Sequence, residues 1–358
     1  MDKKRIDALN GLRGAAACAV ALEHFVISNT YTVPGDLRFE VSAFIGGVAV
    51  AVFFLISGFV TPIALGSTSA REFLIRRALR LYPVFAVCCL LHVAVGILVG
   101  NYAANFDMAR LYFLMVSLVG GLWEPPHAMP QPVVWTLQIE LKFYLICAAI
   151  LWISRGSWAS INRLSLGFLI LVAMFAFKFP GLGPAWTGDI GFAATMLPFM
   201  FIAFFASLHF TGRISAGDMW LGMLASSCVF LMGPMRLFTS WGTPLLSFVL
   251  AAAIFGAVFV YRNSIPFLRG RVANFVGEIS YPMYAIHTSV STLVFSYTPH
   301  GKLPLKFALY VPGVLLASYV IHRWVEKPAI ALSKRLAPGR RNESKPVDLP
   351  AELQLGRR

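Results

Sequence analysis

The chain has 358 residues, of which 58% are hydrophobic and 13% are charged, and its formal net charge is +14. The charged fraction is about half that of an average soluble domain. Too few polar residues remain to cover a soluble surface, which excludes a soluble enzyme, a disordered chain and a disulfide-stapled secreted domain. The composition predicts a polytopic membrane protein, in which the basic residues indicate the side of the bilayer rather than a nucleic-acid partner.

Apolar runs follow one another along most of the chain. A helix needs about 20 mostly apolar residues to cross the hydrocarbon core. Eleven segments are candidates, at 12–30, 43–65, 82–100, 109–122, 134–153, 164–180, 190–211, 217–233, 244–261, 275–297 and 305–325. The fold class we expect is therefore all-α, an integral membrane bundle of helices.

The distribution of charge decides whether the short segment 109–122 crosses. If it does not cross, 23 lysines and arginines lie on the inner side and 6 on the outer side; if it crosses, the numbers become 12 and 17. Cytoplasmic loops carry the excess of positive charge. The sequence thus predicts about ten transmembrane helices with both termini cytoplasmic, and 109–122 as an interfacial or re-entrant helix in a long outer loop.

The first predicted span carries Arg13 and His24. Their spacing places both on one face of a helix, about 16 Å apart along its axis. A histidine within the membrane can accept a proton as a general base, and an arginine at the inner mouth suits a phosphate-bearing ligand. The alternative is a snorkelling arginine with a histidine bonded inside the bundle, and these two residues alone leave both interpretations open.

Three arginines, Arg76, Arg77 and Arg80, lie between the second and third predicted spans. They can be an ordinary inner-face anchor. They can also form an anion site, because guanidinium groups bind phosphate oxygens in pairs.

Further ionisable residues interrupt later spans. Glu140 follows the outer loop and can orient a histidine, bind a hydroxyl or form an ion pair with Lys142. A second intramembrane histidine, His287, weakens a purely structural explanation of the first. Glu326 lies where the last span meets the cytoplasm and can pair with an inner-face arginine. The cysteines and histidines show no zinc-ligand spacing, so no metal site is predicted.

These motifs occur together and in order in the membrane acyltransferase-3 family of bacterial sugar O-acyltransferases, which the sequence resembles over residues 6–332. The matching stretches are Leu9–Gly14, the pair Arg13 and His24, Phe53–Phe59, Arg77–Pro83, Trp135–Tyr144, Ile279–His287 and Glu326–Pro328. Asn10 and Thr136 stand where the family usually has aspartate and serine. The short tail after residue 332 resembles the stand-alone members, without an appended soluble domain.

The resemblance implies roles for individual residues. His24 would be the catalytic base and Glu140 would orient it or the acceptor. The donor, an acyl-CoA and above all acetyl-CoA, is a substrate and not a permanently bound cofactor. The implied donor-binding residues are Arg13, Arg76, Arg77 and Arg80. The implied acceptor or carbonyl contacts are Trp135, Tyr144, Ser280, Tyr284 and His287, with Ser57 and Glu326 in structural roles. Direct attack and an acyl-histidine intermediate both stay open.

The function implied is O-acylation of a cell-surface, exported or lipid-linked glycan, such as exopolysaccharide or lipopolysaccharide, in the bacterial inner membrane. The expected partners are acyl-CoA, the glycan acceptor and membrane lipids, with no nucleic acid. Acylation of a small-molecule natural product is an alternative. A secondary transporter is another, although it predicts inverted repeats, and we find no internal repeat. We expect residues 1–332 to form the transmembrane domain and 333–358 a basic, disordered cytoplasmic tail.

Overall fold

The protein is helical in a computed structural model, which describes residues 3–30, 37–101, 133–178, 189–232, 245–261, 264–299 and 301–338. Within these ranges the chain forms helices and turns and contains no strand. The predicted all-α class is therefore confirmed. The predicted segment 109–122 and most of the predicted tail lie outside the described residues.

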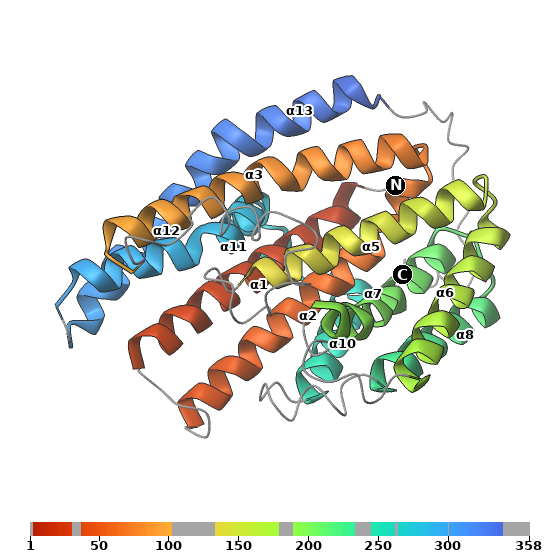
Figure 1. Ribbon diagram of the computed structural model, residues 1–358, viewed down its shortest axis with the longest axis horizontal. Helices are drawn as coiled ribbons and strands as arrows, with labels where there is room; N and C mark the ends of the chain where they lie inside the picture. The colour runs from red at the N-terminus through yellow and green to blue at the C-terminus, as the bar shows by residue number, and fades with distance from the viewer. Residues whose placement is uncertain are drawn as a thin grey trace.

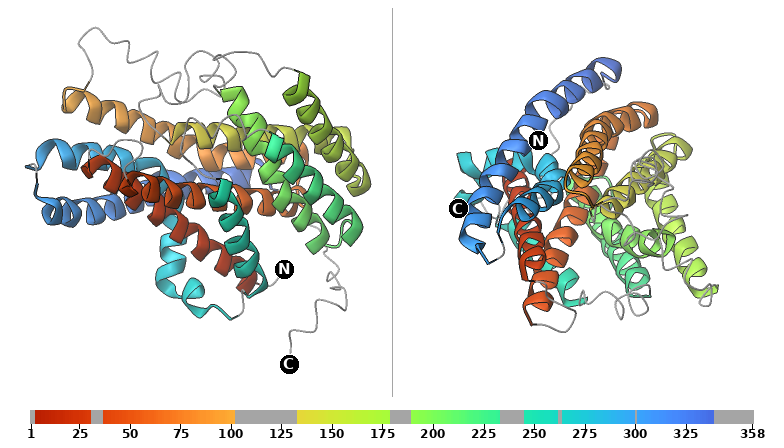
Figure 2. Two further views of the ribbon diagram at one scale, coloured as in Figure 1. Left: turned by 90° about the horizontal axis from the view of Figure 1, so that it is seen from below. Right: turned by 60° about the vertical axis from the view of Figure 1, so that its left-hand side comes forward.

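The helices follow the predicted spans. They are α1 (Lys3–Thr30), α2 (Leu37–Leu65), α3 (Ala70–Leu98), α5 (Val134–Ile153), α6 (Trp158–Lys178), α7 (Asp189–Phe210), α8 (Ala216–Met232), α10 (Leu245–Val260), α11 (Arg271–Tyr297) and α12 (Leu303–Ile321) (Figure 1). A π-helical turn, His322–Glu326, leads directly into α13 (Lys327–Leu336). The boundary expected at residue 332 therefore falls inside a helix. Figure 2 shows α13 lying along α3.

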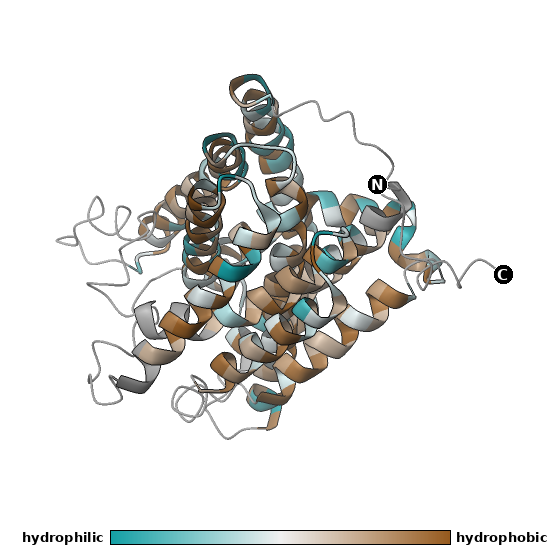
Figure 3. Cartoon of the chain, turned by 90° about the vertical axis from the view of Figure 1, so that its right-hand side faces the viewer, coloured by the Kyte–Doolittle hydropathy of each residue, from teal (hydrophilic) through white to brown (hydrophobic). Residues whose placement is uncertain are grey.

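The helices have the character of a membrane protein. Hydrophobic residues cover most of their length (Figure 3). In the described part of the chain, five helical stretches are long and apolar enough to cross a membrane: Ala8–Ser28, Leu37–Leu65, Ala70–Leu98, Val134–Ile153 and Leu303–Leu336. Four shorter apolar helices accompany them, at Trp158–Met174, Met196–Phe210, Ala216–Met232 and Leu245–Val260. The exact number of spans stays a prediction.

Helix α3 begins about three turns before the predicted third span. Ser69 caps its N-terminus: its hydroxyl accepts a hydrogen bond from the Glu72 backbone, and the Glu72 carboxylate accepts one from the Ser69 backbone. This reciprocal pair satisfies two backbone donors that a helix start leaves open. As a result, the arginines Arg76, Arg77 and Arg80 project from a helix and not from a loop.

Helix α1 packs tightly against α11, and glycines explain how. A Cβ on Gly14 would lie 2.8 Å from the backbone nitrogen of Gly277, and a Cβ on Gly277 would overlap the carbonyl oxygen of Asn10. Small residues let helix backbones approach where lipid provides no hydrophobic drive for association. This interface therefore joins a helix from the first part of the chain to one from its last third.

The contacts fix the relative directions of the helices. Residues 13 and 24 of α1 meet residues 280 and 287 of α11, in the same order, so these helices run parallel. Residues 54 and 57 of α2 likewise meet residues 135 and 140 of α5. A layout of ten alternating spans requires both of these pairs to be parallel. The parallel packing also brings motifs that are distant in sequence to the same level of the bundle.

Candidate active site

A cavity of about 350 Å³ lies among α1, α2, α3, α5 and α11. Its polar lining includes Ser57 and several of the ionisable residues singled out in the sequence, namely Arg13, Arg77, Arg80, Glu140 and Tyr144. Aromatic side chains such as Phe53 and Tyr284 form part of the remaining wall. Three guanidiniums and one carboxylate share this lining, which therefore suits a ligand with several negative charges.

The Glu140 carboxylate joins α5 to α2 at the cavity, and Tyr144 extends the contact to Arg77 of α3. One of its oxygens accepts hydrogen bonds from the Ser57 hydroxyl and from the Tyr144 hydroxyl, each at 2.5 Å. Arg77 donates to the Tyr144 oxygen at 3.4 Å, and its guanidinium carbon lies 4.7 Å from the centre of the Tyr144 ring. The Ser57 hydroxyl thus links α2 to Glu140 of α5, and its implied structural role stays a prediction. Glu140 and Tyr144 therefore lie beside Arg77, and their described hydrogen bonds do not include His24.

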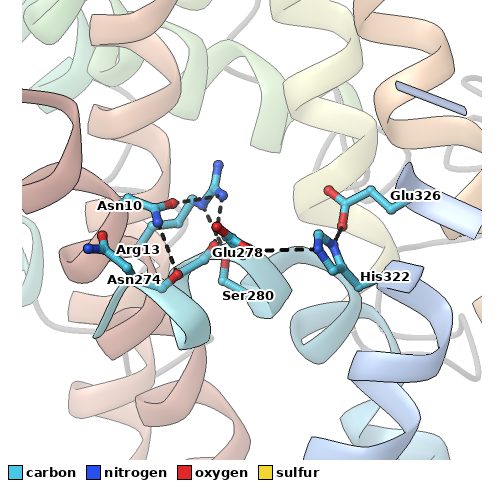
Figure 4. Close-up of polar contacts among 8 residues, drawn as sticks. Asn10, Arg13, Asn274, Glu278, Ser280, His322 and Glu326 are labelled. Carbon is cyan, nitrogen blue, oxygen red and sulfur yellow. Dashed lines mark hydrogen bonds and ion pairs between the residues drawn. The ribbon is translucent and has the colours of Figure 1, made fainter. Parts of the chain in front are cut away.

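Arg13 is held by α11. Its Nε donates to the Ser280 hydroxyl at 2.9 Å, and its Nη2 donates to the Gly277 carbonyl at 2.8 Å and to the Asn10 side-chain oxygen at 3.2 Å (Figure 4). A guanidinium has five N–H groups. These three bonds use Nε and Nη2, so among the described residues both N–H groups of Nη1 are left for a ligand in the cavity that Arg13 lines. Ser280 thus positions Arg13.

His24 and His287 form a pair at another level of the bundle. Their ring centroids lie 5.0 Å apart with an angle of 42° between the planes. His287 is fully buried, and its Nδ1 lies 2.9 Å from the carbonyl of Tyr284 and 3.2 Å from that of Met283. Two carbonyl neighbours assign the proton to Nδ1. The Nε2 of His287 is then an acceptor, and it has no hydrogen-bond partner among the described residues.

A carboxylate that the sequence analysis did not select lies beside His24. The Glu23 oxygen Oε2 is 3.4 Å from the His24 Nε2. A Cβ on Gly46 of α2 would lie 2.9 Å from the Glu23 carboxyl carbon, so the absence of a side chain at Gly46 makes room for this group. The available signal was a second ionisable residue next to the histidine inside an apolar span.

Tyr284 connects the cavity to the histidine pair. Its ring lies 6.1 Å from the His287 ring, centre to centre, while its hydroxyl is 2.7 Å from the Thr136 hydroxyl and its side chain lines the cavity. His24 and His287 themselves lie outside the described lining. The arginines and the imidazoles therefore occupy neighbouring compartments with Tyr284 at the wall between them.

Three predicted residues have other neighbours than expected. Arg76 donates from Nε to the Ala337 carbonyl at 2.7 Å and lies outside the described lining of the cavity. Trp135, also outside that lining, packs against Phe54 with ring centroids 6.2 Å apart. For Glu326, a pairing with an inner-face arginine was one possibility.

Glu326 instead bonds to a histidine. Its oxygen lies 2.6 Å from the Nδ1 of His322, whose Nε2 is 4.0 Å from the Glu278 carboxylate (Figure 4). The π-helical turn from His322 to Glu326 brings these two side chains together, a partnership that a sequence motif without a known helix register does not reveal.

Comparisons with known proteins agree on one family. The family model described as "Acyltransferase domain" matches residues 6–323. Nodulation protein 10 of Rhizobium leguminosarum bv. viciae is 31% identical over 160 residues, which cover 40% of this chain and 44% of that protein. An O-acetyl transferase of Shigella phage Sf6 is 27% identical over 144 residues, which cover 37% of this chain and 42% of that protein. The match thus spans less than half the length of either relative. No solved structure matches the chain.

Proposed function

We propose that this chain, which belongs to the acyltransferase-3 family, is a membrane O-acyltransferase that moves an acyl group from acyl-CoA to a hydroxyl of a cell-surface or exported glycan. The observation that carries the proposal is that two different sites lie side by side in the helix bundle. One is a cavity lined by three arginines, and the other is an imidazole pair, with His287 buried and His24 half-buried, beside a carboxylate.

The arginine-lined cavity supports an acyl-CoA donor. Coenzyme A carries a diphosphate and a further phosphate, and Arg13, Arg77 and Arg80 offer guanidiniums from two helices to one space. A volume of about 350 Å³ lies in the range of small-molecule sites. Acetyl-CoA is the donor we propose, because one relative is named an O-acetyl transferase.

The histidine pair supports base catalysis. In the direct route, His24 takes the proton of the acceptor hydroxyl while the oxygen attacks the thioester carbonyl carbon. The carbon–sulfur bond then breaks, and the proton on His24 passes to the departing thiolate, which leaves as coenzyme A. Glu23, 3.4 Å from His24, would stabilise the imidazolium formed in between. In the alternative route, His24 attacks the thioester carbonyl carbon and the carbon–sulfur bond breaks, with coenzyme A leaving as the thiolate. The acceptor oxygen then takes the acyl group from His24, and the hydroxyl proton passes to the thiolate.

The arrangement also fits a donor that enters from the cytoplasm. We propose that the chain lies in the bacterial inner membrane with both termini inside. Arg13 and the start of α3 would then lie toward the inner face, with His24 about 16 Å further along α1. The glycan would approach His24 from the other side, so the two substrates would meet between the compartments.

The test is acyl transfer by the purified protein in lipid vesicles. The donor is acetyl-CoA labelled in the acetyl group, and the acceptors are purified exopolysaccharide and lipopolysaccharide. We expect label to enter the glycan as an alkali-labile ester, faster than free acetate forms without an acceptor. Label that stays in acetyl-CoA with every glycan tested, under conditions in which coenzyme A binds, would reject a glycan acceptor.

A further inference from the structure

A second pocket, of about 400 Å³, lies between the first turns of α6 and the α7–α8 turn. Helix α6 contributes Asn162 and Arg163, and the α7–α8 turn with the first residues of α8 contributes Arg213, Ser215 and Asp218. None of these residues belongs to the cavity described above.

Asn162 contributes a hydrogen-bond acceptor to the pocket. The residue is 7% exposed, and its side-chain oxygen has no hydrogen-bond partner among the described residues. An unsatisfied buried oxygen costs free energy unless a ligand or water donates to it. Asp218 adds negative charge to the same pocket, where one of its oxygens accepts from the Ser215 hydroxyl at 2.7 Å. This side of the pocket favours a cation that carries N–H groups.

Arginines supply the opposite charge. Arg213 is held in place, since its guanidinium carbon lies 3.7 Å from the centre of the Trp158 ring and its Nη1 donates to the Pro62 carbonyl. Burial lowers the pKa of Arg213 to about 10, so it remains charged at neutral pH. Arg163 is exposed and lines the same pocket. Two guanidiniums favour a phosphate.

Tryptophans place the pocket at the depth of lipid headgroups. Trp152, near the end of α5, is 76% exposed, and Trp220, in the first turns of α8, is 64% exposed. Exposed tryptophans of membrane proteins gather at the boundary between headgroups and acyl chains. Leu221 and Leu224 follow on α8 and are also exposed, as acyl-chain contacts would be.

We propose that this pocket binds the phosphoethanolamine headgroup of a membrane lipid. The phosphate lies against Arg163 and Arg213, and the ammonium donates to Asn162 and Asp218. Phosphatidylcholine has the same charges but no N–H to donate, and phosphatidylglycerol has hydroxyls but no cation. The acceptors Asn162 and Asp218 therefore distinguish the ethanolamine headgroup from those of the other two lipids.

The experiment measures lipid binding by native mass spectrometry of the detergent-purified protein. Phosphatidylethanolamine, phosphatidylcholine and phosphatidylglycerol with identical acyl chains are compared, and free phosphate and coenzyme A are added as competitors. We expect the ethanolamine lipid to bind about tenfold more tightly than the other two, the ratio for one charge-assisted hydrogen bond of modest strength. This readout does not depend on acyl transfer.

Variants assign the preference to the pocket. Asp218→Asn and Asn162→Leu should each bring ethanolamine-lipid binding close to that of the choline lipid, and Arg163→Gln should weaken all three lipids. Arg155→Gln is the control, because Arg155 is exposed in the α5–α6 turn but lies outside the described lining. Equal binding of the three lipids, or a preference that survives in both folded acceptor variants, would overturn the proposal. Displacement of the lipid by coenzyme A or by phosphate would overturn it as well.

Discussion

The imidazole rings of His24 and His287 lie 5.0 Å apart, centre to centre, although they come from opposite ends of the chain. Their helices run parallel and pack through Gly14 and Gly277. The same interface holds Arg13 on Ser280. The proposed base and one proposed phosphate ligand therefore depend on a single helix pair, and the predictions below separate their roles.

Arg77 and Arg76 are neighbours in sequence with different surroundings. Arg77 lines the cavity, whereas Arg76 donates to the Ala337 carbonyl. We expect Arg77→Ala to raise the KM for acetyl-CoA by about tenfold or more, because a charge-assisted contact is lost. Arg76→Ala should leave this KM close to that of the unaltered protein. Steady-state kinetics with varied acetyl-CoA measures both, and an equal rise in the two variants would reject the distinction.

Tyr144 links Arg77 to Glu140 through its hydroxyl. Tyr144→Phe keeps the ring beneath the guanidinium and removes the hydroxyl, so we expect a rise of about threefold to tenfold in the KM for acetyl-CoA. Ser57→Ala removes the other bond to Glu140 and leaves Arg77 in place. If Ser57→Ala raised this KM as much as Tyr144→Phe, the link through Arg77 would not be the cause.

Glu23 lies beside His24 in the space left by Gly46. Glu23→Gln removes the charge that would stabilise the imidazolium, so we expect kcat to fall by about tenfold to a hundredfold with little change in the KM for acetyl-CoA. Gly46→Ala should lower kcat in the same way, because its methyl group displaces the carboxylate. The control is Gly256→Ala, since a Cβ there has no atom of the described structure within 4 Å. A loss of activity in the control equal to that in Gly46→Ala would point to general helix damage.

The topology can be tested at the α5–α6 turn. A reporter fused after Ser154 should read as cytoplasmic, because α2 and α5 run parallel and the ten-span layout places both ends on the inner side. The measurement is the ratio of a periplasm-active to a cytoplasm-active enzyme fusion. A periplasmic reading would contradict the ten-span layout.

The sequence analysis predicted the positions of the helices and the shared face of Arg13 and His24. Both residues do meet α11, as residues on one helix face can. Apolar length and the 100° helical step are local properties, which explains why they can be read from the chain. Helix α3 begins before the predicted span 82–100, because its first turns carry the polar arginines that an apolar run excludes.

The partners of the site residues could not be predicted in the same way. Ser280 was expected to contact the acceptor or the carbonyl, and it binds Arg13 in the structure. Glu140 was expected to orient His24 or the acceptor, and its described hydrogen bonds go to Ser57 and Tyr144. The Arg13–Ser280 and Glu140–Ser57 pairs depend on which helices pack together, which no local pattern in the sequence shows. The Glu140–Tyr144 bond is a local contact within α5. Glu23 was overlooked although it is an ionisable residue next to His24 in an apolar span; the room that Gly46 leaves for it appears only in the structure.

The central claim, that His24 carries the proton transfer of an acyl transfer, is tested most directly by one substitution. His24→Ala is reconstituted in vesicles beside the unaltered protein, and the transfer of labelled acetyl from acetyl-CoA to the glycan is measured. His209→Ala is the control, since His209 bonds to the Ile214 carbonyl at the end of α7, away from the His24–His287 pair. We predict that kcat falls by about 10²-fold to 10⁴-fold in His24→Ala, the usual share of general base catalysis, while coenzyme A still binds. Full activity of the folded His24→Ala protein would contradict the account.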